Sequence, residues 1–339
     1  MKKIAFIIVT VMVTRLTAFP VDLQVPDLSN GIMNQYSYNF VNASMTARGN
    51  TGISTNGKIG SGIYNPASYY SEQDHFVVEL FIKNSVEDFT KKYYENDDEL
   101  YLNKNRYKQT RPISFIGIGL APIYGDWNLG ISYSLNRSIK FKSPIFPYTA
   151  KYNEKQYILT INKPFGNFVI GLNNIFLRQD YDDYWNTEFN EKVTFSENIL
   201  RLQLGALYDM EKVQFGLTYT PKNEKTIGRQ NFRIDVVYPS KLSAGISFVP
   251  YQSLRTLLDL EYTRYSETSK ELSNQLIWKI GIENIHESVI LKVGLIYFPD
   301  VFTGNYILHG DGEDLKYGLF DDKDLLIATA GAHFLSPKK

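Results

Sequence analysis

Residues 127–135 read Trp-Asn-Leu-Gly-Ile-Ser-Tyr-Ser-Leu, and this stretch decides the class of fold. Large apolar or aromatic residues occupy every odd-numbered position, whereas the even-numbered positions hold only Asn, Gly and Ser. Because successive side chains of a β-strand point to opposite faces, the alternation predicts a strand with one apolar face. The same alternation recurs at 200–208, 213–219, 242–248, 276–282, 289–297 and 326–334, and more weakly at 74–82, 111–121, 156–163, 168–177 and 254–264.

The number and length of these segments indicate an antiparallel up-and-down β-barrel that crosses a membrane. They make twelve strands, most of them nine to eleven residues long, the length at which a tilted strand crosses a bilayer. In this count 232–249 is one long strand bent at Pro239, since proline cannot donate to a ladder. Short and long connections then alternate, as periplasmic turns and outer loops do in outer-membrane barrels. Two separate strands within 232–249 would break this alternation after residue 240.

Two features favour the membrane barrel over a secreted β-sandwich, which shows the same alternation with its apolar face in the core. Aromatic residues such as Trp127, Tyr219 and Phe248 stand near strand ends in phase with the apolar face, as interfacial girdles do. The opposite face carries repeated glycines, although glycine weakens a strand and usually marks a bend or a close approach. These glycines predict a lumen kept wide enough to hold something, and they are Gly130, Gly205, Gly216, Gly245, Gly281, Gly294 and Gly331.

The beginning of the chain reads as a secretory signal peptide at 1–18. Lys2 and Lys3 precede an apolar run at 4–13 that is too short to span a bilayer, and a small-residue cleavage site follows. Cleavage would remove three of the 36 basic residues and leave 33 against 36 acidic ones, so no nucleic-acid partner is expected. The chain has no cysteine, so an exported form depends on its ladder and its packing. These features favour the outer membrane of a Gram-negative-type bacterium.

Residues 19–73 precede the expected barrel at 74–339 and become rich in Gly, Asn, Ser and Thr towards their end. An even number of strands leaves both ends of a barrel on the periplasmic side, so this arm is expected to enter the bore from below as a hatch. Asn65, Pro66 and Ala67 predict a rigid bend before the first strand, since proline fixes its own φ and keeps the preceding residue extended. The alternative is a disordered periplasmic tail that ends in an ordinary turn.

Three stretches resemble the FadL-type family of outer-membrane transporters for long-chain fatty acids, toluene and similar hydrophobic compounds. They are similar to the family's hatch and to two of its later hairpins, and read ASMTARGNTGISTNGKIGSGIYNPAS (43–68), YPSKLSAGISFVPYQSLRTLLDLEYTRYS (238–266) and IWKIGIENIHESVILKVGLIY (277–297). The resemblance implies an all-β transmembrane barrel of fourteen strands, against the twelve counted, with an N-terminal hatch in its lumen. A further hairpin would then lie in 83–110 or 299–324. It also implies passive, hatch-gated uptake of small hydrophobic molecules, fatty acids first, with no cofactor.

Two other classes of function stay open: a surface or structural barrel, and a secretion-accessory barrel with a protein partner. An enzyme is not expected, because the chain has no Gly-x-Ser-x-Gly nucleophile motif. No metal centre is expected, because the four histidines lack metal-ligand spacing. Acidic clusters at 95–99, 180–183, 311–314 and 321–324 read as solvated loop charge, with divalent-cation binding as the alternative. We expect a monomer surrounded by outer-membrane lipid.

Two sets of residues are candidates for ligand contact. Ile145, Phe146 and Tyr148 place apolar side chains in an otherwise polar outer loop, and such a patch is typical of a binding surface. We interpret it as the landing site for an apolar ligand; the alternative is that these side chains pack the loop onto itself. Arg48 and Lys58 are the two cations of 19–73 and are candidates to pair with a ligand carboxylate.

Overall fold

The structure is a computed structural model, and it describes part of the chain. The described residues are 43–55, 57, 59–69, 76–82, 85–95, 98–109, 113–120, 126–142, 148–185, 192–229, 232–268, 273–286, 288–299, 306–309, 314–317 and 324–334. The expected signal peptide at 1–18 and the expected hatch up to residue 42 lie outside them. Among the described residues, no helix combines the length and the apolar character needed to cross a bilayer.

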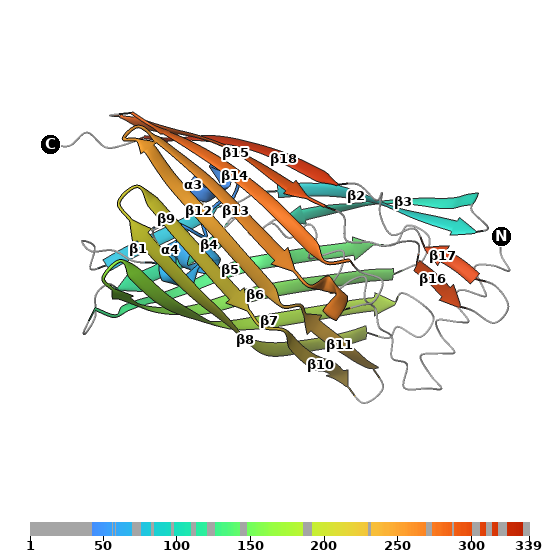
Figure 1. The fold of residues 1–339 in the computed structure, drawn as a ribbon. Helices are drawn as coiled ribbons and strands as arrows, with labels where there is room; N and C mark the ends of the chain where they lie inside the picture. The colour runs from blue at the N-terminus through green and yellow to red at the C-terminus, as the bar shows by residue number, and fades with distance from the viewer. Residues whose placement is uncertain are drawn as a thin grey trace.

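Twelve strands form one antiparallel sheet in which the neighbours follow each other along the chain. The sheet curves around two short helices, α3 and α4, which lie on its concave side (Figure 1). β1 and β18 stand at the two ends of the strand order. The strands are β1 (Phe76–Ile82), β4 (Ile113–Leu120), β5 (Asn128–Lys142), β6 (Tyr148–Phe165), β7 (Phe168–Trp185), β8 (Lys192–Met210), β9 (Val213–Thr220), β12 (Lys241–Tyr251), β13 (Leu254–Thr263), β14 (Gln275–Ile285), β15 (Val289–Phe298) and β18 (Leu325–Phe334).

This sheet confirms the all-β, up-and-down architecture, and each of its twelve strands overlaps one of the segments predicted from alternation. One detail of the prediction is wrong, because 232–249 is not a single strand. β11 (Phe232–Tyr238) ends before Pro239 and pairs with β10 (Asn223–Arg229) away from the main sheet. The alternation of short and long connections survives, because β9 and β12 are antiparallel neighbours and the β10–β11 hairpin lies within the long connection between them.

The two longest connections contain hairpins that meet in a separate four-stranded sheet. β2 (Ser85–Glu95) pairs with β3 (Asp98–Gln109), and β16 (Tyr306–His309) pairs with β17 (Asp314–Tyr317). β17 then pairs with β2 in the order β16-β17-β2-β3, so connections from opposite ends of the chain lie side by side (Figure 1). Within the described residues the main sheet therefore has twelve strands, and the hairpins in 83–110 and 299–324, where the resemblance predicts a further hairpin, stand outside it.

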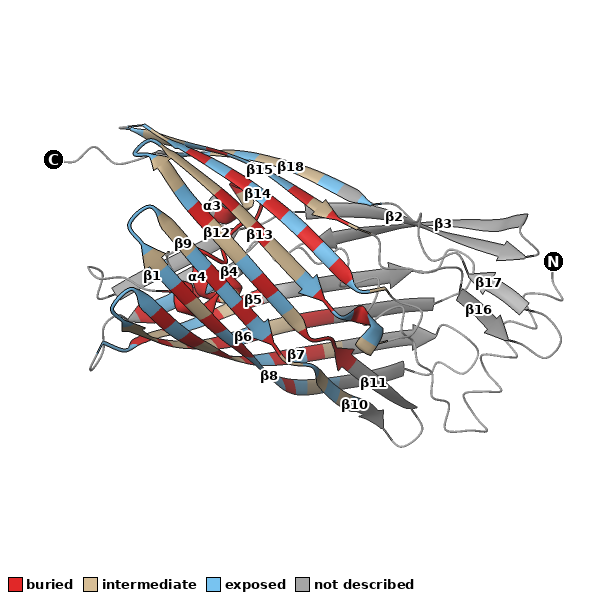
Figure 2. Ribbon diagram, in the orientation of Figure 1, coloured by how far each residue is buried: buried red, intermediate tan, exposed pale blue. Residues whose placement is uncertain are grey.

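The polarity of the sheet is inside-out relative to a soluble protein. In β14 the side chains of Gln275, Lys279 and Glu283 are buried, with exposed fractions of 1%, 5% and 4%. The alternate residues Trp278 and Ile280 are exposed at 46% and 43%. Figure 2 shows this alternation as stripes along neighbouring strands, with α3 and α4 buried inside the curve. A soluble β-sandwich buries the opposite face, so the pattern is that of a wall with hydrocarbon outside and polar groups inside.

Candidate functional site

Residues 43–55, 57 and 59–69, called the inner segment below, lie within the curve of the main sheet (Figure 1). They contain α3 (Ala43–Ala47), α4 (Ile59–Tyr64) and the short 3-10 turn η2 (Pro66–Ser68). Helices of five and six residues are too short to be stable alone, so the wall of the sheet must hold them. The inner segment also has a small core of its own, formed by Met45, Ile53, Tyr64 and Tyr69.

Glycines on the inner face of the sheet make room for the backbone of the inner segment. A Cβ atom added to Gly294 would lie 1.9 Å from the backbone nitrogen of Gly49. One added to Gly216 would lie 1.9 Å from the carbonyl oxygen of Ile53. Atoms do not approach this closely, so the close backbone contact requires residues without a side chain.

The predicted lumen glycines lie along this contact. At six of the seven positions an added Cβ would come within 3.0 Å of an atom of the inner segment, and these are Gly205, Gly216, Gly245, Gly281, Gly294 and Gly331. Gly130 is buried and pairs across the ladder with Gly119. We did not predict Gly171, where a Cβ would lie 2.3 Å from the carbonyl carbon of Pro66. The sequence could have identified Gly171, because it lies at an alternate position of the predicted strand 168–177.

Asn65, Pro66 and Ala67 are buried at the point where the inner segment turns towards β1. The Asn65 side-chain oxygen accepts a hydrogen bond from the backbone N–H of Ala67 at 3.0 Å, which caps η2. Its Nδ2 donates to the carbonyl oxygens of Ile53 at 2.7 Å and of Ala206 in β8 at 3.0 Å. One side chain thus joins the bend, the inner segment and the wall, and Asn65 has the extended backbone expected before proline.

Amide side chains of the wall donate hydrogen bonds to the carbonyl groups of the inner segment. Asn162 of β6 donates to the carbonyl oxygen of Pro66 at 2.9 Å, and Asn173 of β7 donates to that of Gly62 at 2.7 Å. We did not single out these wall residues, because only the fold shows which carbonyl groups they face. Buried carbonyls that would otherwise lack a partner are satisfied in this way.

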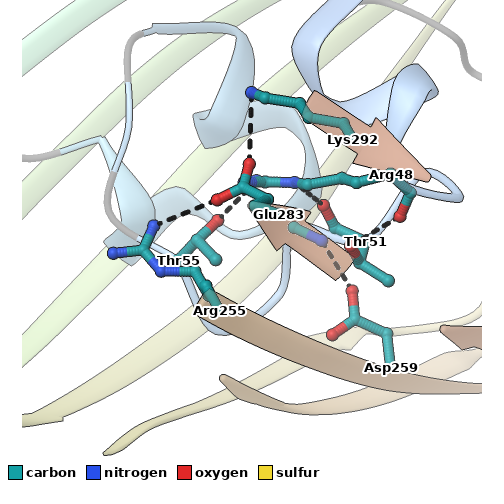
Figure 3. A network of polar contacts seen from close by, with 8 residues as sticks. Arg48, Thr51, Thr55, Arg255, Asp259, Glu283 and Lys292 are labelled. Atoms are coloured by element: carbon teal, nitrogen blue, oxygen red, sulfur yellow. Dashed lines mark hydrogen bonds and ion pairs between the residues drawn. The ribbon is translucent and has the colours of Figure 1, made fainter. Parts of the chain in front are cut away.

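A charged cluster holds the other end of the inner segment (Figure 3). The Arg48 guanidinium donates from Nη1 to Glu283 Oε1 at 2.9 Å, and also to the carbonyl oxygen of Thr51 and the hydroxyl of Thr55, each at 3.0 Å. The Glu283 carboxylate also lies 3.1 Å from Lys292 Nζ and 3.5 Å from Arg255 Nη1. Glu283, Lys292 and Arg48 are all nearly fully buried.

The structure therefore pairs Arg48 with a carboxylate of the protein itself, that of Glu283. A ligand carboxylate that reached Arg48 would compete with Glu283 for it. The pairing of Arg48 with a ligand stays a prediction, and Lys58 lies outside the described residues. Ile145 and Phe146 also lie outside them; Tyr148 begins β6, and its side chain is not described. Within the described part of the chain, no group of three His, Cys, Asp or Glu side chains is placed to hold a metal ion.

Asp259 of β13 provides a second anchor for the inner segment. Its Oδ2 accepts hydrogen bonds from the backbone N–H groups of Gly52 at 2.6 Å and Ile53 at 3.0 Å, and the residue is fully buried. Replacing Asp259 with Ala is expected to leave both N–H groups buried without this acceptor, at about 1–3 kcal/mol each. Thermal unfolding in detergent, together with trypsin cleavage at Arg48, measures the loss. Asp259→Asn keeps an accepting oxygen and should lose less; equal losses in the two variants would contradict this role.

Above the inner segment, part of the inner wall is apolar, although Gln156 and Arg201 lie at the same level. In the register of β6, β7 and β8 a polar row of Thr160, Asn173 and Gln203 faces the inner segment. Six residues further along β7 is a second polar level, with Glu154 opposite Gln179. Between these levels lies a buried cluster, called the apolar layer below, which is formed by Ile158, Ile175, Leu177 and Ile199 and is covered by Ile63 of α4 and Tyr238 of β11.

No protein-family model and no curated protein matches the chain. Solved structures do match its fold. A Pseudomonas aeruginosa FadL homologue has a TM-score of 0.59 and 11% identity, over 86% of this chain and 96% of that one. The toluene transporter TodX of P. putida has a TM-score of 0.56 and 10% identity, over 85% and 96%. A TodX deltaS2S3 mutant, described as a monoaromatic hydrocarbon channel, has a TM-score of 0.59 and 12% identity, over 85% and 92%. These matches confirm at the level of fold the resemblance seen in the sequence: the chain has the barrel fold of the FadL homologue and of TodX.

Proposed function

We propose that this chain is a passive outer-membrane channel for small hydrophobic molecules, with residues 19–73 acting as its hatch. The inside-out polarity of the sheet and the fold shared with TodX support this proposal. In the proposal the protein is a monomer surrounded by lipid, 1–18 is removed on export, and the concentration gradient drives uptake. The loop with Ile145, Phe146 and Tyr148 would be the first contact for the ligand.

The apolar layer is the observation that carries the proposal. A lumen lined only with polar groups suits water-soluble solutes, whereas an apolar molecule gains free energy when it leaves water for an apolar wall. The two polar levels that bound the layer, at Asn173 and Gln179, are six residues apart, or about 20 Å along β7. Ile63 belongs to the inner segment and covers the layer, so a shift of this segment would open a path from the layer towards the periplasmic end.

Uptake into proteoliposomes tests this function. We expect the wild-type protein to increase the entry of both oleate, a long-chain fatty acid, and toluene. The Ile158→Ser/Ile175→Ser variant alters two residues that face each other in the ladder, and it should reduce entry about tenfold, because hydrophobic contacts in a pocket contribute about 1–3 kcal/mol. Leu200→Ser, which alters an exposed residue on the outer face, is the matched control.

The outcomes separate the candidate functions. Entry of neither compound through the wild-type protein would contradict the channel and favour a structural barrel. Co-purification of one exported protein, with no entry of either compound, would favour a secretion-accessory role. Entry of oleate without toluene, or the reverse, would identify the class of ligand and leave the channel in place.

A further inference from the structure

Tyr238 is the last residue of β11, where the extra β10–β11 hairpin returns to the main sheet. Its side chain covers the apolar layer. Val237 and Tyr238 end β11, Pro239 and Ser240 connect it to β12, and all four residues are buried. This connection is attached at Ser240, whose N–H and hydroxyl donate to the Glu267 carboxylate at 2.7 and 3.0 Å. The β10–β11 hairpin itself belongs to a two-stranded sheet and is held to β8 by side chains, with Asn223 donating to the carbonyl oxygen of Leu200 and Lys225 pairing with Glu197. A movement of Tyr238 would therefore leave the ladder of the main sheet intact.

The Tyr238 side chain fills a site with three kinds of partner. Its hydroxyl donates to Glu154 Oε2 at 3.1 Å and accepts a hydrogen bond from Gln179 Nε2. The guanidinium carbon of Arg201 lies 4.4 Å from the centre of its ring, in the geometry of a cation–π contact. The remaining ring surface packs on the apolar layer. The wall is therefore matched to a phenol in its shape, its hydrogen bonds and its charge.

We propose, on the basis of the channel function proposed above, that Tyr238 is a displaceable lid and that its site binds a small phenol during uptake. The side chain of tyrosine is equivalent to p-cresol, so p-cresol is able to make each contact that the lid makes. An apolar ring without a hydroxyl would leave the Glu154 and Gln179 side chains without that partner, which costs free energy in a buried site. The buried Glu154 carboxylate would repel a ligand carboxylate, so the head group of a fatty acid does not bind at this position.

Calorimetric binding of p-cresol to the purified protein in detergent tests the lid. Tyr238→Gly removes the occupant, so the site no longer has to open, and p-cresol should bind at least about tenfold more tightly than to the wild-type protein. Toluene has the same ring and methyl group without the hydroxyl, and it should bind this variant about tenfold more weakly than p-cresol. Tyr265→Gly is the matched control, because it removes another buried tyrosine away from the apolar layer and should create no such site.

Three results would overturn the proposal: equal p-cresol affinity in Tyr238→Gly and the wild-type protein, equal affinity of Tyr238→Gly for p-cresol and toluene, or p-cresol binding created equally by Tyr265→Gly. If Tyr238→Gly does not fold, Tyr238→Phe serves in its place. That lid has no hydroxyl, so p-cresol should bind severalfold more tightly than to the wild-type protein, and an unchanged affinity would overturn the proposal. Entry of toluene or oleate into proteoliposomes without a phenol site would reject the lid and keep the channel, whereas a phenol site without any entry would reject the channel.

Discussion

Replacing Glu283 with Gln is expected to release the inner segment from the wall of the sheet. The Glu283 carboxylate is 4% exposed and pairs with Arg48, Lys292 and Arg255 at 2.9, 3.1 and 3.5 Å. A neutral amide at this position leaves three cations close together without their shared anion. Loss of one partner of a buried ion pair typically costs about 3–5 kcal/mol, because the remaining charge stays desolvated. Arg255 and Lys292 belong to the strands of the wall, whereas Arg48 belongs to the inner segment. Movement of Arg48 away from the wall therefore relieves the repulsion among the three cations most directly.

Limited trypsin cleavage at Arg48 in detergent measures this release, because Arg48 is buried while the inner segment is docked. We expect rapid cleavage in Glu283→Gln and increased ion conductance across a planar bilayer as the lumen opens. Glu261→Gln is the matched control: Glu261 pairs with Lys241 at 2.6 Å and with Lys279 at 2.8 Å, both of which belong to the wall. It should lower the unfolding temperature while Arg48 stays protected. Equal protection in Glu283→Gln and the wild-type protein would refute the anchoring role.

Replacing Gly294 with Ala is expected to displace the inner segment through sterics alone. The new Cβ would lie 1.9 Å from the nitrogen and 2.3 Å from the Cα of Gly49, and 2.2 Å from the carbonyl carbon of Arg48. All three are backbone atoms, so no change of side-chain rotamer relieves the collision. Overpacking by added methylene groups costs about 1–3 kcal/mol and occasionally more, and we expect the upper end of this range or beyond.

The same cleavage and conductance measurements apply to Gly294→Ala. The barrel itself should keep its strand content by circular dichroism, because alanine is compatible with a strand and the outer face is unchanged. Val293→Ala provides the control on the neighbouring, outward-facing position, which is 51% exposed. It should leave both the conductance and the protection of Arg48 at wild-type values. A docked inner segment in Gly294→Ala would mean that the glycine is not needed for close approach.

The contrast between the predicted and the observed position of Arg48 shows where sequence reasoning ends. Its place in the inner segment marked it as a cation within the lumen, but its partner Glu283 is 235 residues away. The two meet because β14 belongs to the wall that faces α3 and the turn after it. Likewise, Asp259 and Asn162 look like ordinary polar positions in alternating strands. Only the register of the sheet shows that they satisfy the backbone of the inner segment.

Pro239 shows the same limit for secondary structure. Proline predicted a bend, which is correct, but the pattern did not show that β11 leaves the main sheet to pair with β10. The hairpins β2–β3 and β16–β17 were missed as strands of a separate sheet, because their pairing joins Tyr94 to Lys316 across most of the chain. Alternation identifies a strand by the two faces it presents, and these segments show no sustained alternation of apolar and polar residues.

By itself, the sequence determined where the twelve strands lie along the chain, which face of each is apolar, and where glycine interrupts the polar face, but not how far strands such as β7 and β8 extend. These are local properties, since the pleat turns every second side chain to the same side regardless of the neighbouring strand. The tertiary structure alone decided that the glycines receive the backbone of the inner segment, that Arg48 meets Glu283, and that Tyr238 covers the apolar layer. Those contacts depend on strand register and on the curvature of the sheet, which arise only when segments hundreds of residues apart are hydrogen-bonded into one wall.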